Sequence, residues 1–310
     1  MSILSLATLL FSWLFIAVIT ALVCAPAYPL VRRISAKVPV HAKPRILFGY
    51  AFLPVVCATL SIVIYELPVL NALLVDYHCH NEQCGPHSLY APVSGSIGAG
   101  VLIVGVLLLV ALILVLLRQI RNNVRFNITL SAVGKAEMHS SYRIIETHEP
   151  GAWCVGLFDP IIYLTRGLLH QFTPEQVAMV VHHEVCHAKH LDNLKLLLAR
   201  WITLIWLPWQ RKQLLSDLAN AHELRCDAYA LSQSGCHSAS EALVQACMQH
   251  AAPPSQQGRI NAIRHSEHGG TAKVAKLYAV FACLVVLCAA AMLIIVVVHL
   301  GHPVIEWLMQ

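Results

Sequence analysis

Four apolar runs, each long enough to cross a bilayer as a helix, constrain the fold of this chain more than any other feature. They cover residues 3–23, 46–75 and 97–117, and a last run that begins at Val274 or Leu277 and ends at Val298. Hydrophobic residues make up 57% of the chain and charged residues 12%, against about 45–50% and about 25% in soluble domains. We therefore predict a multi-pass α-helical membrane protein.

The lysines and arginines between these runs predict how the runs are oriented. Arg32 and Arg33 follow the first run and Arg118 and Arg121 follow the third, whereas residues 76–94 contain no lysine or arginine. Because positive charge collects in cytoplasmic loops, we expect residues 26–45 and 118–273 inside the cell and residues 76–94 and both termini outside. The alternative for the first run, a cleaved secretory signal, is disfavoured because no basic residue precedes it.

This orientation divides the chain into three parts. Residues 1–117 hold three transmembrane helices, residues 118–273 form one cytoplasmic domain, and residues 274–310 hold the fourth helix and a short outer tail. The small net charge of +5 is concentrated in the loops beside the spans, so we expect the lipid bilayer as a partner and no direct binding of nucleic acid. The expected location is the cell (inner) membrane.

The cytoplasmic part contains the pattern His183-Glu184-x-x-His187. A helix is expected here, because Thr173 and Gln176 form a capping box around Pro174 and no glycine or proline occurs from residue 177 to 201. Side chains four residues apart lie on one face of a helix, so both imidazoles can hold the same zinc ion. Glu184 would then act as the general base for the attacking water.

A third ligand is predicted on a later helix. Glu223 follows His187 by enough residues for one helix to turn back on another, and Asp227 lies one helical turn after Glu223 on the same face. Asp227 is expected to accept a hydrogen bond from the free nitrogen of a zinc histidine. Two histidines and one carboxylate leave the fourth position open, as a catalytic zinc site requires. The alternative for Glu223 and Asp227 is a solvated helix face.

Several polar residues near these ligands have no single predicted role. His222, Arg225 and Tyr229 are candidates to stabilise the oxyanion, but a structural role is favoured for each of them. His182 and His190 flank the motif on other faces of the helix and are expected to be ordinary polar residues.

Short β-type runs at residues 142–147, 152–157 and 161–165 predict a small sheet before the zinc helix. Its edge strand could pair with an extended substrate backbone, or the strands could form a merely structural hairpin. Residues 194–209 continue the zinc helix as an apolar segment with three tryptophans, which favours a position against the inner leaflet. A fifth, shorter span and a buried soluble helix are the alternatives.

The pattern resembles the BlaR/MecR-type antirepressor metallopeptidases, which are membrane zinc peptidases. The resemblance covers about residues 140–232 and rests on four features: His183-Glu184-x-x-His187 followed by Asp192-Asn193, then Trp206-Leu207-Pro208, then Glu223-x-x-Cys226-Asp227, and upstream residues 156–164. It implies a cytoplasmic α+β gluzincin-type zinc metallopeptidase domain that binds Zn²⁺. It also implies a metalloendopeptidase that transduces a signal by cleaving itself or a cytoplasmic transcriptional repressor, with a homodimer as one option for its assembly.

Two alternative functions remain open. HtpX-type membrane proteases, which serve quality control or processing, share the two-helix zinc scaffold. A non-proteolytic signal transducer is the other alternative, and the intact Glu184 weighs against it. Sensing of β-lactams is not expected, because the relatives carry a large extracellular domain after the last span and only about a dozen residues follow that span here.

The outer loop between the second and third spans is rich in potential ligands. It carries Cys79 and Cys84 together with His78, His80 and His87, and the other outer end carries His299 and His302. These residues are compatible with a metal-responsive sensor. A small disulfide between the two cysteines, surrounded by solvated histidines, is the alternative.

Overall fold

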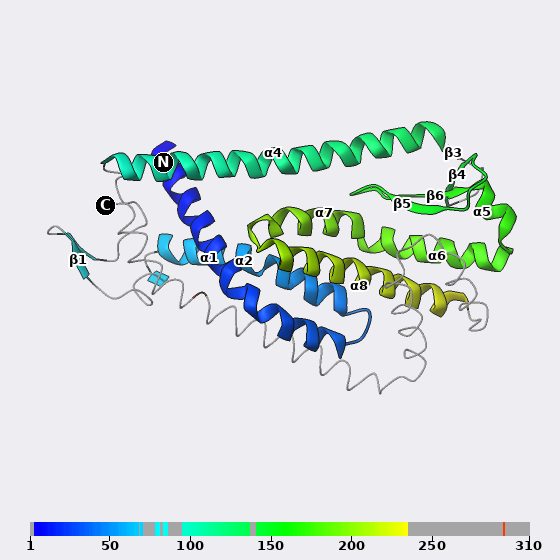
Figure 1. The fold of residues 1–310 in the computed structure, drawn as a ribbon, viewed down its shortest axis with the longest axis horizontal. Coiled ribbons are helices and arrows are strands. Elements are labelled where there is room, and N and C mark those ends of the chain that lie inside the picture. Colours follow the sequence, from blue (N-terminus) through cyan, green and yellow to red (C-terminus); the bar gives the residue numbers. More distant parts are fainter. Residues whose placement is uncertain are drawn as a thin grey trace.

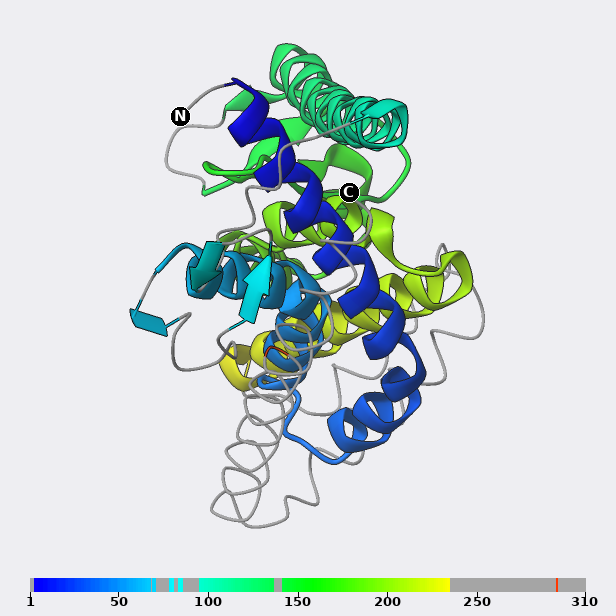
Figure 2. The ribbon, with the colours of Figure 1, turned by 90° about the vertical axis from the view of Figure 1, so that its left-hand side faces the viewer.

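The structure is a computed structural model that describes residues 3–67, 69–70, 78–80, 83–85, 95–136, 141–234 and 294 of the chain (Figures 1 and 2). The described part is mostly helical, with a small mixed sheet. Three of its helices are long and apolar enough to cross a membrane, over Leu9–Ala36, Lys43–Glu66 and Ile103–Val133. The predicted class, a multi-pass helical membrane protein with an additional α+β region, is therefore confirmed.

The candidate spans belong to helices α1 (Ile3–Ala36), α2 (Lys43–Glu66) and α4 (Gly95–Val133). Helix α1 extends past the expected end at residue 23 and includes Pro26 and Pro29, whereas α2 ends at Glu66, before the expected residue 75. Helix α4 continues past Leu117, beyond the three arginines that follow the apolar run. The fourth expected span, residues 274–298, lies outside the described residues except for Ile294.

Strands β1 (His78–His80) and β2 (Gln83–Gly85) form an antiparallel pair in the loop between the second and third spans. Their register places Cys79 opposite Cys84. His87, His299 and His302, the other members of the expected outer cluster, lie outside the described residues. The choice between a disulfide and a metal site therefore stays a prediction.

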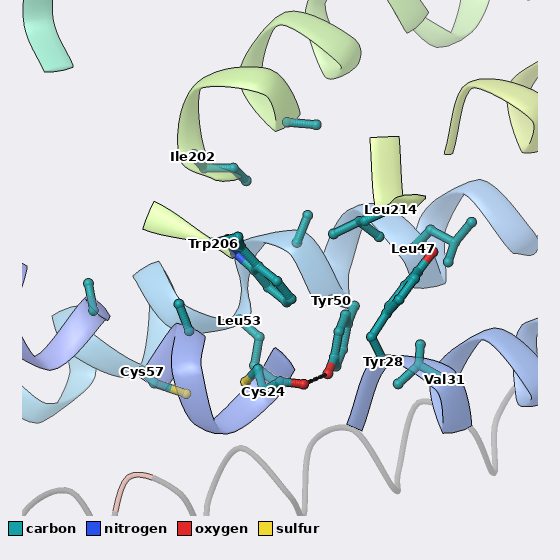
Figure 3. Close-up of a cluster of buried hydrophobic side chains, with 14 of the residues drawn as sticks. Cys24, Tyr28, Val31, Leu47, Tyr50, Leu53, Cys57, Ile202, Trp206 and Leu214 are labelled. Carbon is teal, nitrogen blue, oxygen red and sulfur yellow. Dashed lines mark hydrogen bonds between the residues drawn. The ribbon is translucent and has the colours of Figure 1, made fainter. Parts of the chain in front are cut away.

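The largest core among the described residues joins α1 and α2 to the later segment of residues 199–221 (Figure 3). Trp206 is buried against Tyr50 of α2, with ring centroids 5.5 Å apart, and the Tyr50 hydroxyl donates to the carbonyl oxygen of Cys24 in α1. Leu214 is completely buried in the same cluster. The apolar core of these two spans thus continues into residues 199–221.

Residues 194–209 form the middle of this arrangement. They comprise most of α7 (Asp192–Ile202), the 3-10 turn η1 (Thr203–Ile205) and the start of α8 (Pro208–Ser234). Ile202 and Trp206 pack into the core with α1 and α2, and the Trp201 indole donates to the carbonyl oxygen of Leu112 in α4. Of the three tryptophans, Trp209 is the exposed one, at 66%. The segment therefore packs beside the candidate spans and does not lie apart from them.

A four-stranded sheet lies between helix α6 (Pro174–His190) and the C-terminal part of α4 (Figure 1). Its strands are β3 (Lys135–Ala136), β4 (Arg143–Ile145), β5 (Ala152–Val155) and β6 (Ile161–Thr165), in the spatial order β3-β4-β6-β5. The three expected β-type runs are thus confirmed as strands, whereas β3 was not expected. Strand β5 forms one edge of the sheet, antiparallel to β6.

Helix α6 (Pro174–His190) begins as expected. The Thr173 side chain accepts from the backbone N–H of Gln176, and the Gln176 side chain accepts from the backbone N–H of Thr173. Its middle packs on the sheet, where Met179 and Val180 meet Ile162. Helix α5 (Arg166–Gln171) links the sheet to α6.

The expectation that this helix continues unbroken past residue 190 is wrong. Leu191 adopts a left-handed conformation with φ 51°, so α6 ends at His190 and a separate helix, α7, starts at Asp192. The left-handed conformation of a non-glycine residue is unfavourable by about 1–2 kcal/mol of free energy. The sequence has leucine and not glycine at this position, so it did not predict the break. The contacts made by Asp192, described below, offset this cost.

Candidate metal centre

Helices α6 and α8 lie side by side and bring three potential ligands together (Figure 1). The Nε2 atoms of His183 and His187 are 3.1 Å apart. The carboxylate of Glu223 lies 3.5 Å from each of these nitrogens, with one oxygen toward each ring. The structure thus unites the three residues that the sequence nominated as metal ligands.

The spacing of the donor atoms of these three residues suits zinc. Tetrahedral zinc binds histidine nitrogen and carboxylate oxygen at about 2.0–2.2 Å, which places neighbouring ligand atoms about 3.3–3.5 Å from one another. The observed separations of 3.1, 3.5 and 3.5 Å lie close to that range. The side chains of His183 and His187 are 17% and 14% exposed and that of Glu223 is 38% exposed, so the centre opens to one side.

Each histidine of the centre has its own carboxylate on the ring nitrogen that points away from the ligand cluster. Nδ1 of His183 lies 3.0 Å from Oδ1 of Asp227, which is the kind of contact that the sequence predicted for Asp227. Nδ1 of His187 lies 2.9 Å from Oδ2 of Asp192. A donor bond from Nδ1 leaves the Nε2 lone pair free for a metal and holds the ring in place.

Sequence reasoning did not assign Asp192 a role. Asp192 follows His187 by five residues, and on an unbroken helix it would not have faced that ring. The turn at Leu191 brings its carboxylate back to His187. The available signal was an acidic residue shortly after the second histidine, in a stretch otherwise suited to continuous helix.

Asp192 is buried and holds several partners besides His187. Its Oδ1 lies 2.8 Å from Nδ1 of His222, and Nη2 of Arg225 donates to both carboxylate oxygens. Burial by itself would raise the pKa of Asp192, but hydrogen bonds from His187, His222 and Arg225 outweigh it and hold that pKa far below its usual value. Asp192 is therefore a buried, ionised hydrogen-bond acceptor.

Acidic side chains surround the histidines and favour a cation at the centre. Burial lowers the pKa of His183, but its hydrogen bonds to Asp227 and Glu223 and the charges of Asp227 and Glu184 raise that pKa to about 10. The same negative potential that holds a proton favours a divalent metal ion in its place.

Glu184 lies beside the ligands and under the edge of the sheet. Its carboxylate accepts a hydrogen bond from the backbone N–H of Cys154 in β5. Burial raises the pKa of Glu184, and Glu223 raises it too, while His183 and His187 oppose the shift. A half-buried carboxylate with a raised pKa, next to a metal centre, suits proton transfer.

Asn193 joins the same strand to the start of α7. Its Nδ2 donates to the carbonyl oxygen of Cys154 at 2.8 Å and contacts that of Gly156 at 3.3 Å. The outer backbone groups of Cys154 therefore contact Glu184 and Asn193.

The register of β5 leaves Ala152 available at the free edge. The backbone N–H of Thr165 donates to Gly151 on the β6 side, so Gly151, Trp153 and Val155 direct their main-chain groups toward β6. Ala152 and Cys154 therefore direct theirs outward. Within the described ranges, no hydrogen bond engages the N–H or C=O of Ala152.

The remaining candidates lie outside the ligand cluster. Tyr229 accepts a hydrogen bond from the Lys189 ammonium at 2.6 Å, and His190 contacts the carbonyl oxygen of Cys186 at 2.9 Å. His182 lines a separate hollow of about 500 Å³ along the first half of α6. His222 and Arg225 are buried, and both contact the carboxylate of Asp192. Because their side chains are engaged there, the oxyanion role considered for them is disfavoured.

Two thiols lie next to the centre without belonging to it. Cys186 and Cys226 are buried and hydrogen-bonded to each other, and Sγ of Cys226 lies 3.9 Å from Oδ2 of Asp192. Cys226 could join a second cluster with His187 and Asp192, but the Arg225 guanidinium already occupies the carboxylate of Asp192. The set of His183, His187 and Glu223 is complete without a thiol.

Comparison with known proteins supports this site. Residues 118–217 match the model of peptidase family M48, a segment that contains both histidines and Glu184 and ends before Glu223. No solved structure matches the chain.

Proposed function

We propose that this membrane zinc metallopeptidase, a hydrolase that cleaves peptide bonds and uses Zn²⁺ as its cofactor, is an endopeptidase whose general base is Glu184. The observation that carries the proposal is the convergence of the Glu184 carboxylate, the three ligand side chains and the edge of β5 at one place. A base, a metal centre and a strand edge are the parts needed to hold and cleave an extended peptide.

His183, His187 and Glu223 would hold the metal, which supplies a Lewis acid for water and for the scissile carbonyl. Glu184 takes the proton of the attacking water on its carboxylate and returns it to the leaving amine. Asp227 and Asp192 keep the two imidazoles oriented through Nδ1.

The substrate backbone is proposed to add to β5 through Ala152. An incoming antiparallel strand forms its N–H and C=O hydrogen bonds with every second residue of the edge strand. Ala152 is such a residue, because both of its main-chain groups point outward. The next outward residue is Cys154, whose N–H contacts Glu184. A peptide bound at Ala152 would therefore run toward the base and the metal ligands.

For the biological role, we propose a regulatory peptidase that cleaves itself or a cytoplasmic repressor, with the peptidase region of residues 118–273 on the cytoplasmic side. This role rests on the resemblance carried by Glu223-x-x-Cys226-Asp227 and on the basic loops beside the spans. The second candidate is a processing or quality-control protease of HtpX type. The continuous packing of α7 and α8 against α1 and α2 favours it, because that packing brings the site near membrane substrates.

The central test compares the full-length protein in detergent with its Glu184→Gln variant. The variant should retain zinc and lose at least about 1,000-fold in cleavage of an unstructured protein substrate, because it lacks the base and keeps every ligand. Hydrolysis at the wild-type rate by Glu184→Gln would refute the mechanism.

Mapping of new N-termini in cells that express either form separates the two roles. A regulatory peptidase predicts a few cleavages, in the chain itself or in a repressor, that Glu184→Gln abolishes. A quality-control protease predicts many cleavages across membrane proteins.

A further inference from the structure

We propose that Arg225 is a positioning residue for the metal ligand His187 and acts through Asp192. The inference rests on the proposed metallopeptidase function and adds a residue that touches neither the metal nor the substrate. Arg225 is 5% exposed and Asp192 is 1% exposed, so the pair is buried inside the protein.

The contact geometry places Arg225 where it can control the direction of the Asp192 carboxylate. A single terminal nitrogen, Nη2, donates to both oxygens, at 2.6 Å to Oδ1 and closer to Oδ2. Oδ2 is also the atom that lies 2.9 Å from Nδ1 of His187. A carboxylate held at both oxygens cannot rotate about its last bond without losing a charged hydrogen bond.

The two histidines differ in how their carboxylates are held. Asp227, which contacts His183, lies on α8 one turn after Glu223. The third ligand, Glu223, and the carboxylate that orients His183 therefore belong to the same rigid helix. Asp192, which contacts His187, sits at the start of α7 just after the break at Leu191. It needs a second contact to fix it relative to α8, and Arg225 supplies that contact from α8 itself.

Charge gives a second reason for a guanidinium at this position. Asp192 is 1% exposed, and a buried carboxylate without a cation is strongly unfavourable. His222 also contacts Asp192, with Nδ1 2.8 Å from Oδ1. Arg225 adds the cation, because Nη2 of its guanidinium donates to both oxygens of this carboxylate.

The alternative is that Arg225 only stabilises the packing of α8 against α7. The two roles predict different effects on metal binding. A positioning residue affects the affinity for zinc, because loss of the hydrogen-bond partner that orients a metal ligand weakens metal binding by about 10–100-fold. A packing residue sets the thermal midpoint of unfolding and leaves the affinity of the folded protein unchanged.

The experiment measures the zinc dissociation constant of the full-length protein in detergent, by competition with a chromophoric chelator and without substrate. Arg225→Met should weaken zinc binding by about 10–100-fold, and Arg225→Lys should recover most of that loss because it restores the cation. The double variant Arg225→Met with Asp192→Asn should bind zinc about as weakly as Asp192→Asn alone, because both changes break one chain of contacts.

Asp217→Asn is the matched control on the same helix. Asp217 accepts hydrogen bonds from Tyr28 and Arg32 and lies away from the metal centre, so its loss should lower the thermal midpoint without changing zinc affinity. Wild-type zinc affinity in folded Arg225→Met, or additive losses in the double variant, would overturn the proposal.

If Arg225→Met does not fold, Arg225→Lys and Arg225→Gln decide the question. Weaker zinc binding in Gln than in Lys supports the proposal, and equal affinity in the two overturns it. Because no substrate is present, a wild-type protein that binds zinc and cleaves nothing would refute the proposed function and leave this inference standing.

Discussion

The side chain of Asn193 donates to the carbonyl oxygen of Cys154 at 2.8 Å and so ties the first turn of α7 to the edge strand of the sheet. Its neighbour Asp192 turns the other way, to Nδ1 of His187. The left-handed Leu191 precedes both residues and interrupts the helical course of α6. Two consecutive side chains thereby connect the metal ligands to the strand that is proposed to bind substrate.

Replacing Asn193 by alanine should reduce kcat/KM by about tenfold and leave zinc content unchanged. The loss of one or two partly buried hydrogen bonds, each worth about 0.5–1.5 kcal/mol, frees β5 to shift relative to Glu184. Arg200→Ala, an exposed position on the same helix, serves as the control and should behave as wild type. Loss of zinc in Asn193→Ala would show that the residue supports the ligands and not the strand.

Replacing Glu223 by alanine should remove most of the bound zinc, whereas Glu184→Gln should keep it. Only the first change deletes a donor atom, and the two histidines alone make a poor zinc site. Elemental analysis of the two purified variants checks the difference. Equal zinc content would mean that the third ligand has been misassigned.

Proline at position 152 should raise KM by about tenfold or more with little change in zinc content. Proline removes one backbone N–H, and at Ala152 that group points out of the sheet, where an edge strand tolerates the substitution. Ala152→Val is the control, since it keeps the N–H and favours a strand. Equal KM values in the two variants would exclude backbone pairing at this residue.

The orientation of the chain can be tested with an impermeant thiol reagent on intact cells. A cysteine introduced at the exposed Glu149 should be protected, because the charge pattern predicts that this loop lies in the cytoplasm. A cysteine introduced at Ser94 should be labelled. Labelling at position 149 from outside the cell would invert the proposed topology.

The motif residues could be predicted because their relationship is local. His183 and His187 are four residues apart, about one helical turn, so they face the same side of the helix. The capping box at Thr173 determines where that helix starts. The same periodicity applies to Glu223 and Asp227 on α8. The apolar runs likewise required three long helices in the described part of the chain, because length and hydropathy are properties of the sequence.

The break at Leu191, the second carboxylate and the buried pair of Asp192 and Arg225 were decided by tertiary structure alone. Leu191 has no local preference for a left-handed conformation, and it adopts one because the contacts of Asp192 with His187, His222 and Arg225 outweigh the cost. Likewise, the apolar content and tryptophans of residues 194–209 favoured a position against the inner leaflet, but only the packing of Trp206 on Tyr50 showed which protein surface covers part of this segment. Such long-range contacts depend on which helices meet, and no local pattern encodes that choice.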